Sequence, residues 1–152
     1  MQNAKVEELL VLRTMRISDY AQVMALWGNT ESMSLRGADS EENIALYLKK
    51  NPGLSFVLEK QGLVIGAVLA GTDGRRGYLQ HLAVSATFRG EGFGKQLVNA
   101  VIDALAKQGI AKTHLFVHAD NKAAQGFYES MGWFARDEVR MFSFNSSSEL
   151  NV

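Results

Sequence analysis

The sequence of 152 residues contains no cysteine. A disulfide framework, a thiolate metal site and a cysteine nucleophile are therefore excluded, and this composition favours the cytoplasm. No apolar run approaches the ~20 residues that a membrane-spanning helix needs. The start of the chain, Met-Gln-Asn-Ala-Lys-Val-Glu-Glu, carries acids and lacks the apolar core of a signal peptide. We therefore expect a soluble cytoplasmic protein with no membrane partner.

The chain also lacks an excess of either charge, because 16 lysines and arginines balance 16 aspartates and glutamates. A general nucleic-acid binder needs a basic surface, so nucleic acid is not an expected partner. Neither internal repeats nor linker-like segments are visible. We predict one domain over residues 1–152, with its core at about residues 10–144 and a serine-rich, frayed tail at 145–152.

Periodicity and turn residues predict the elements of this domain. Helices are expected to begin at three N-caps, Ser18, Ser40 and Asn121, and after the glycines near residue 92. The second helix must end before Pro52, and residues 29–39 form a loop or a broken helix. The predicted strands are residues 10–15, 54–59, 63–70, 78–84 and 113–118, followed by a last pair at 133–136 and 139–144.

The most informative stretch is residues 78–95, a buried strand followed by a glycine-rich loop that opens a helix. Glycines at 90, 92 and 94 let the backbone turn tightly where the helix begins. The first N–H groups of a helix lack intrahelical acceptors and face the positive end of its dipole. The stretch therefore predicts an anion site, most plausibly for phosphate.

Two familiar phosphate loops do not fit this stretch. A dinucleotide fingerprint needs Gly-x-Gly-x-x-Gly, whereas the spacing here is Gly-x-Gly-x-Gly. A P-loop needs four residues between its first glycine and Gly-Lys-Ser/Thr, but Arg89 occupies the position of that first glycine and Gln96 follows Lys95. The dinucleotide interpretation therefore fails on spacing, and the P-loop interpretation fails as well.

The pattern that fits is Arg/Gln-x-x-Gly-x-Gly/Ala, supplied by Arg89, Gly92 and Gly94 after a strand that ends Leu-Ala-Val. This pattern resembles that of the GNAT family, the Gcn5-related N-acetyltransferases. A second stretch from Leu115 to Trp133 is similar to the family's strand and helix pattern, as are residues 12–15 with Asp19. The resemblance covers roughly residues 10–144. It implies an α/β (α+β) fold, with a mixed, mostly antiparallel central sheet flanked by about four helices.

The resemblance also implies an acyltransferase that uses acetyl-CoA as cosubstrate and no metal. A primary amine would attack the thioester directly, and a backbone N–H near Val84 would stabilise the tetrahedral intermediate. Tyr128 would be the catalytic residue that donates a proton to the leaving thiolate. The alternative interpretation is that Tyr128 is a core residue whose ring only packs. The implied acetyl-CoA-binding residues are Leu82, Ala83, Val84, Arg89, Gly90, Glu91, Gly92, Phe93, Gly94, Lys95, Asn121 and Tyr128.

The amine must lose a proton, and the sequence does not identify the group that takes it. Relatives often place Glu or His on the strand face shared by Tyr78 and Gln80, where this chain has neither. Strict alternation would put His81 on the opposite face, as a packed histidine. Two candidates for the group that takes the proton therefore stay open. One is His118, and the other is a water chain that ends at Glu31, Tyr78 or solvent. The expected acceptor-side residues are Glu31, Arg36, Tyr78, Gln80 and His118.

Two functions from different classes remain. The first is an acetyl-CoA-dependent N-acetyltransferase whose amine acceptor is a small molecule or a protein. The second is a catalytically idle domain that binds acyl-CoA as a sensor or interaction module. The missing proton acceptor favours the second and Tyr128 the first, because binding alone needs no donor to a thiolate. Both a monomer and a homodimer are compatible with either function.

Overall fold

The computed structural model describes residues 9–152 and is built on one sheet whose strands lie in sequence order, β1-β2-β3-β4-β5. The first four strands pair antiparallel, and β5 pairs parallel with β4. The expected mixed, mostly antiparallel sheet is therefore confirmed. The strands are β1 (Leu10–Thr14), β2 (Phe56–Lys60), β3 (Leu63–Thr72), β4 (Gly77–Val84) and β5 (Thr113–His114).

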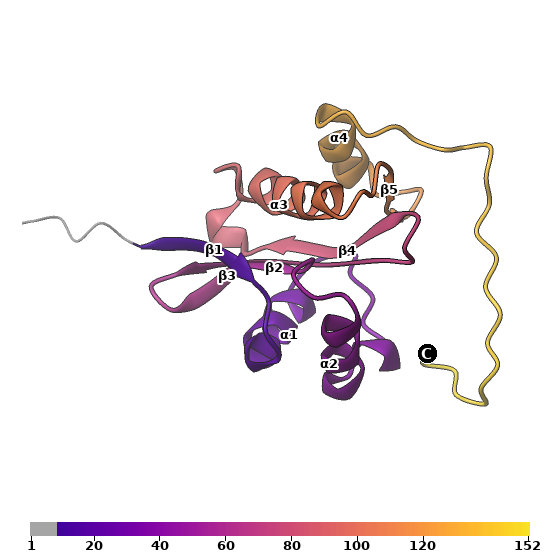
Figure 1. The fold of residues 1–152 in the computed structure, drawn as a ribbon, viewed down its shortest axis with the longest axis horizontal. Coiled ribbons are helices and arrows are strands. Elements are labelled where there is room, and N and C mark those ends of the chain that lie inside the picture. The colour runs from indigo at the N-terminus through magenta and orange to yellow at the C-terminus, as the bar shows by residue number, and fades with distance from the viewer. Residues whose placement is uncertain (1–8) are drawn as a thin grey trace, which may run out of the picture.

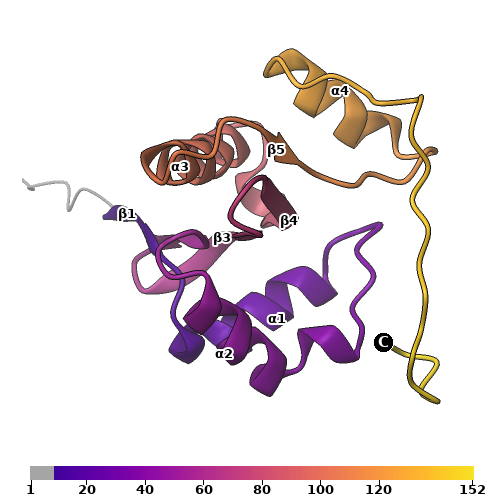
Figure 2. The same ribbon diagram turned by 45° about the vertical axis from the view of Figure 1, so that its right-hand side comes forward.

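Helices cover both faces of the sheet, with α1 and α2 on one face and α3 on the other (Figures 1 and 2). The fourth helix, α4, lies beyond α3 on the same side. Four α-helices were expected, and residues 9–152 contain four. Their bounds are α1 (Tyr20–Gly28), α2 (Glu41–Lys50), α3 (Phe93–Lys107) and α4 (Lys122–Ser130), with short 3-10 turns η1 (Ile17–Asp19), η2 (Gly37–Asp39) and η3 (Ala86–Phe88).

Two apolar clusters hold these layers together. The cluster under α3 contains the helix residues whose spacing predicted an amphipathic helix, and the cluster under α1 and α2 contains Trp27 and Ile44. Strand β3 is buried almost throughout because helices cover both of its faces. The helix residues that α3 buries are Leu97, Val98, Val101 and Leu105.

Local signals placed most of the helix ends correctly. The Ser40 hydroxyl accepts a hydrogen bond from the N–H of Asn43, and the Asn121 carboxamide accepts one from Ala124, so both predicted N-caps are confirmed. Ser18 is not the N-cap of α1. It lies inside the 3-10 turn η1, whose last residue, Asp19, is the N-cap of α1.

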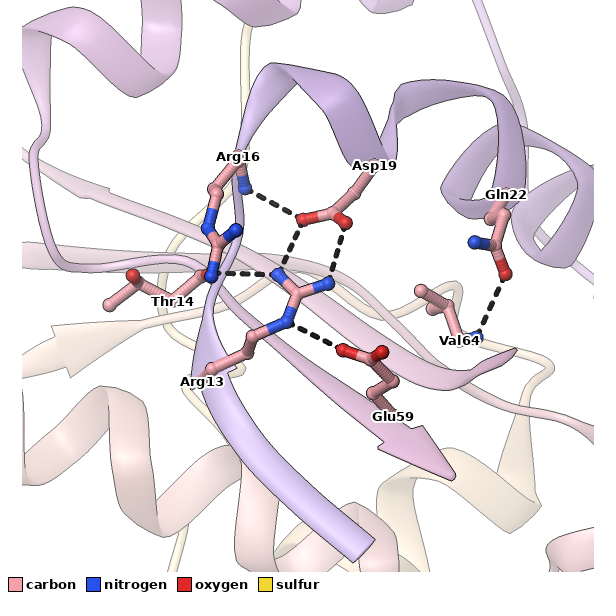
Figure 3. A network of polar contacts seen from close by, with 7 residues as sticks. All are labelled: Arg13, Thr14, Arg16, Asp19, Gln22, Glu59 and Val64. Carbon is pink, nitrogen blue, oxygen red and sulfur yellow. Dashed lines mark hydrogen bonds and ion pairs between the residues drawn. The ribbon is translucent and has the colours of Figure 1, made fainter. Parts of the chain in front are cut away.

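A polar network fixes the entry to α1 (Figure 3). Two guanidinium nitrogens of Arg13 bond the two Asp19 oxygens at 2.7 and 2.8 Å, and the third bonds Glu59 at 2.8 Å. Asp19 also accepts the N–H of Arg16 at 2.8 Å. Hydrogen bonds from Arg13 lower the pKa of Asp19 despite its burial. The network therefore joins β1, β2 and the start of α1.

The end of the chain differs from the prediction. Strand β5 has two residues rather than the expected 113–118, and residues 133–136 and 139–144 form no strands. After α4 the chain runs extended, away from the sheet (Figure 1). It therefore finds no neighbouring strand, and a strand without a partner cannot form a hydrogen-bonded ladder. Farther along, the carbonyl of Asn151 accepts the N–H of Gly37 at 2.8 Å.

Candidate active site

Strands β4 and β5 part soon after they meet. Only two residue pairs join them, at the start of β4, where Tyr78 faces His114. From Leu79 to Val84 the strand is paired with β3 on one side only. Its outer backbone edge, including the expected acetyl-CoA contacts at residues 82–84, therefore faces no strand of residues 9–152.

Strand β4 contains a bulge beside this open edge. Ala67 of β3 pairs with Ala83, and Leu69 pairs with Gln80. The single β3 residue between them therefore lies opposite two residues of β4. His81 sits in the bulge with a φ of +51°, which is rare for a residue other than glycine. Leu79 and Leu82 both pack on the α3 side, although three positions separate them. Regular alternation is therefore interrupted at His81.

The bulge turns His81 towards α1. Its ring centroid lies 4.9 Å from that of Trp27, which is fully buried in the cluster under α1. Because Leu79 packs on the α3 side, alternation places Tyr78 and Gln80 on this same α1 side. The expectation that His81 lies on the opposite face from them is wrong. The extra residue is the physical reason, since it shifts the side-chain period of 2 by one position.

His81 is paired with a carboxylate from the loop before α2. Its Nε2 lies 2.8 Å from Oδ1 of Asp39, with side-chain exposures of 21% and 8%. The other Asp39 oxygen accepts the N–H of Arg36, and the Asp39 carbonyl accepts the hydroxyl of Tyr20. These bonds fix the carboxylate. When Nε2 carries the proton that bonds Asp39, Nδ1 of His81 keeps its lone pair.

The start of α3 supplies unused backbone donors. Gly92 is the N-cap in a left-handed conformation, with φ of +82°, and Gly90 has φ of +83°. A Cβ at either glycine would meet no protein atom within 4 Å, so the space in front of them is open. The first helical bond is from the N–H of Gln96 to Gly92. The N–H groups that precede it have no acceptor among residues 9–152, and they belong to Phe93, Gly94 and Lys95.

The third glycine of the loop has a different surrounding. A Cβ at Gly94 would lie 3.3 Å from the ring of Phe127, so glycine allows α4 to pack against α3. The exposed side chains of Glu91 and Lys95 form no hydrogen bond or ion pair with residues 9–152. The side chain of Arg89 turns back, donating to the carbonyl of Val84 at 3.2 Å. Its other end lies 3.6 Å from Glu31, an exposed ion pair worth little energy by itself.

Tyr128, the expected donor to the thiolate, lies on α4 and packs against the cluster under α3. Its ring packs edge to face against Phe127 at 5.0 Å and Trp133 at 5.6 Å. Burial raises the pKa of Tyr128 to about 12. Its hydroxyl has no hydrogen-bond partner in the described part of the chain. The phenol is therefore protonated at neutral pH and free to donate.

The other expected acceptor-side residues are less constrained. Arg36 and Gln80 are exposed, and Arg36 also contacts Asn151 at 3.4 Å. The Tyr78 hydroxyl donates to Asp73 at 3.4 Å. His118 lies in the turn before α4 instead of at a strand end, and its carbonyl accepts the N–H of Asn121.

Other sites are not evident within residues 9–152. No cluster of three metal-ligating side chains occurs in that range, and none of its helices has the length and apolar character to cross a membrane. A surface hollow of about 510 Å³ lies at the other end of α3, beside Lys107 and Gln108. It is therefore separate from the glycine loop.

The pairing of His81 with Asp39 was not predicted from the sequence. They are 42 positions apart, and no local pattern links them. The available signal was Gly66 in β3, because a glycine inside a strand often marks a bulge in the pair. Gly66 pairs with Val84, close to the irregular register.

Comparison with known proteins identifies relatives across most of the chain. The model of the acetyltransferase (GNAT) family matches residues 21–133. An acetyltransferase of Yersinia enterocolitica is 32% identical over 130 residues, which is 86% of this chain and 92% of that protein.

Solved structures share the fold at lower identity. The aminoglycoside N-acetyltransferase in complex with CoA matches with a TM-score of 0.73 and 18% identity, over 93% of this chain and 98% of the other. The ribosomal-protein-S18-alanine N-acetyltransferase from Escherichia coli matches with a TM-score of 0.67 and 24% identity, over 82% and 77%. Such identities establish a common fold and leave the substrate open.

Proposed function

The chain belongs to the acetyltransferase (GNAT) family, and on that premise we propose that it transfers the acetyl group of acetyl-CoA to a primary amine. The observation that carries this proposal is the group of free N–H donors at the start of α3, next to the unpaired edge of β4. The first feature suits a pyrophosphate and the second suits a pantetheine arm that bonds to backbone.

The glycine loop fits an anionic ligand in shape as well as in charge. The space before Gly90 and Gly92 is open, so phosphate oxygens could approach the backbone there. Lys95 adds a positive charge one turn into the helix. One solved structure with the same fold contains CoA, which supports the same ligand class for this chain.

The reaction forms an N–C bond and breaks the C–S bond, and the electron pair of the broken bond leaves with the thiolate. Tyr128 is the donor that meets this charge. Full proton transfer from a phenol of pKa about 12 to a thiolate whose thiol has a pKa near ~8.5 is uphill by roughly 5 kcal/mol. Tyr128 therefore stabilises the thiolate first by donating a hydrogen bond.

We propose that Nδ1 of His81 accepts the proton that the attacking amine loses. The bond from Nε2 to Asp39 sets the tautomer that leaves Nδ1 as acceptor, and the carboxylate stabilises the imidazolium that forms. The ring stands on the acceptor-loop side of β4, next to residues 82–84. This assignment removes the main argument for a catalytically idle domain, which was the missing proton acceptor.

The acceptor is proposed to enter beside residues 29–39. This loop touches the site twice, through Asp39 on His81 and through Glu31 near Arg89. Loops often determine substrate specificity, whereas the glycine loop would bind the same cosubstrate for every acceptor. The two solved structures named above act on an aminoglycoside and on a protein alanine, so a small molecule and a protein amine are both compatible with the fold.

Acetyl-CoA binding can be tested by thermal unfolding of the wild type and of Gly92→Val. We expect the wild type to gain roughly 2.7 kcal/mol when acetyl-CoA is a hundredfold above its dissociation constant. Gly92→Val should abolish the gain, because a branched Cβ blocks the approach of phosphate and strains a positive φ. Gly62→Val is the matched control, since Gly62 has φ of +79° and equally open space in the distant β2–β3 turn.

Equal acetyl-CoA responses of the two folded variants would contradict the pyrophosphate assignment. Incubation of wild type with acetyl-CoA and a broad panel of amines, read by free-thiol release, then separates the two functions. Release that depends on an amine supports the transferase. Binding without release for any amine supports the idle acyl-CoA-binding domain.

A further inference from the structure

Trp27 contains a buried polar atom that its surroundings do not use. The side chain is fully buried, and its indole N–H is the one buried side-chain donor without an acceptor in the part of the chain that the structure describes. A buried unpaired donor destabilises a fold, whereas a phenylalanine or a leucine would fill an apolar cluster without that cost. Packing alone therefore does not account for an indole at this position.

The ring beside Trp27 is that of His81. Helix α1, which carries Trp27, lies against the face of the sheet below β4 (Figure 2). The two ring centroids are 4.9 Å apart, and the ring planes are inclined by 57°. Because His81 is only partly buried, its imidazole contacts Trp27 on the interior side and keeps part of its surface open to solvent.

The backbone at His81 also requires support. Its φ of +51° lies in the left-handed region, where a residue other than glycine stays only when neighbouring contacts hold it. The side chain offers two such contacts, the bond between Nε2 and Asp39 at 2.8 Å and the ring of Trp27. The bulge in β4 therefore presents a histidine that is held from two directions.

The two contacts have different effects on the imidazole. The bond at Nε2 fixes one corner of the ring and leaves its plane free to tilt, whereas a second ring packed beside it restricts the tilt. Among aromatic side chains, an indole attracts a cation most strongly, within about 6 Å of the ring centroid. The distance between the rings of Trp27 and His81 falls inside that range. An indole therefore suits a neighbour that becomes an imidazolium.

We propose that Trp27 is a positioning residue, which fixes the plane of the His81 imidazole while Asp39 holds Nε2, so that Nδ1 keeps one direction. The inference rests on the proposed function, because it takes His81 as the group that accepts the proton of the amine. Trp27 is fully buried, so it acts through His81 and not on either substrate. This role accounts for an indole whose own N–H has no acceptor.

The first test is a double-mutant cycle read by thiol release. Trp27→Leu should lower turnover by about 10-fold, because a small displacement of a reacting group is costly, while the Michaelis constant for acetyl-CoA stays unchanged. If Trp27 acts only through His81, the double variant Trp27→Leu/His81→Gln should be no slower than His81→Gln alone. Losses that multiply in the double variant would overturn the inference.

Val23→Ala is the matched control for lost packing, since Val23 lies one turn earlier on α1 and is buried in the same cluster. It leaves both rings in place, so its turnover should equal that of the wild type wherever the protein is folded. Trp27→Phe retains a ring and should recover most of the turnover. It also replaces Trp27→Leu in the cycle if the leucine variant does not fold. Equal losses in Val23→Ala and the Trp27 variant would reduce Trp27 to a core residue.

The second test needs no activity. Long-range proton–nitrogen NMR correlation distinguishes the two neutral tautomers of each of the three histidines, His81, His114 and His118. At a pH where the imidazoles are neutral, His81 should be a single Nε2–H tautomer in the wild type and a mixture in Trp27→Leu or Trp27→Phe, with the other two histidines unchanged as internal references. The same His81 spectrum in wild type and variant would overturn the inference. A wild type that acetylates no amine instead refutes the proposed function, and the NMR comparison still decides whether Trp27 positions His81.

Discussion

Residues 9–110 and residues 111–152 differ in how much they bury. Every buried core side chain belongs to the first part, where the last one is Ile110. The second part contains β5, α4 and the extended chain after α4, and none of its side chains is buried. The first part therefore contains the apolar core, whereas the second has few buried apolar contacts to stabilise it.

The candidate active site lies across this boundary. The first part supplies the start of α3, the open edge of β4 and the His81–Asp39 pair. The second supplies Tyr128 and Asn121 from the least buried helix. Segments of low local stability are where functional motions concentrate, so the placement of Tyr128 is expected to depend on how α4 packs against α3.

The largest expected effect concerns the contribution of the second part to chemistry. Tyr128→Phe keeps the ring and its packing, so stability should change little, while turnover should fall by about 10² to 10⁴. Rapid-mixing or steady-state assays of thiol release measure this, with acetyl-CoA binding followed separately. Turnover equal to wild type would leave Tyr128 as a packing residue, and an equal loss of stability and activity would indicate the same.

The contrast in burial itself can be tested with one substitution in each part. Leu97→Ala removes a fully buried side chain under α3 and should lower the free energy of unfolding by about 2–5 kcal/mol. Leu150→Ala makes the same chemical change at a 94% exposed position and should stay within about 0.5 kcal/mol. Chemical denaturation measures both. A comparable loss at Leu150 would mean that the end of the chain is packed.

His81→Gln tests whether the first part provides the proton acceptor. Loss of a positioned base should lower turnover by about 10- to 100-fold, with water taking over part of the role. The Michaelis constant for acetyl-CoA should not change, because the substitution leaves the glycine loop intact. Asp39→Asn should reproduce the defect, since it removes the carboxylate that orients the ring. A pH–rate profile identical to wild type in both variants would exclude the pair.

The smallest effect concerns the Arg13–Asp19 network and its pH dependence. The pKa of Asp19 is lowered in the folded state, so its contribution to stability is present above the unfolded value of about 3.9 and is lost as pH falls through the folded value. Asp19→Asn should cost about 1–2 kcal/mol at pH 7 and flatten the acid limb of stability below about pH 4.

Asp103→Asn serves as its control, because the Asp103 side chain is exposed and has no ion pair or hydrogen bond among residues 9–152. Denaturation at a series of pH values gives both slopes. The same acid limb in Asp19→Asn and wild type would show that the network does not couple folding to Asp19.

Much of the fold could be predicted because its signals are local. Ser40 and Asn121 cap helices through bonds to residues three positions ahead, and Gly109 ends α3 with a positive φ that glycine tolerates. The glycine loop was located for the same reason. The prediction of Ser18 as an N-cap was wrong because Asp19 bonds Arg13 in β1. A cap pattern considers only the residues that follow the cap, so it does not include this contact.

The amino-acid sequence by itself determined the order of the elements from β1 to α4, the glycine turn before α3 and the family, since each follows from residues a few positions apart. Tertiary structure alone decided three features. The bulge in β4 set the face of His81, a loop 42 residues away supplied Asp39, and the path of the chain after α4 left residues 133–144 without a strand partner. The physical reason is that pairing register and strand partners depend on which distant segments meet, and a strand pattern states only that a segment can pair.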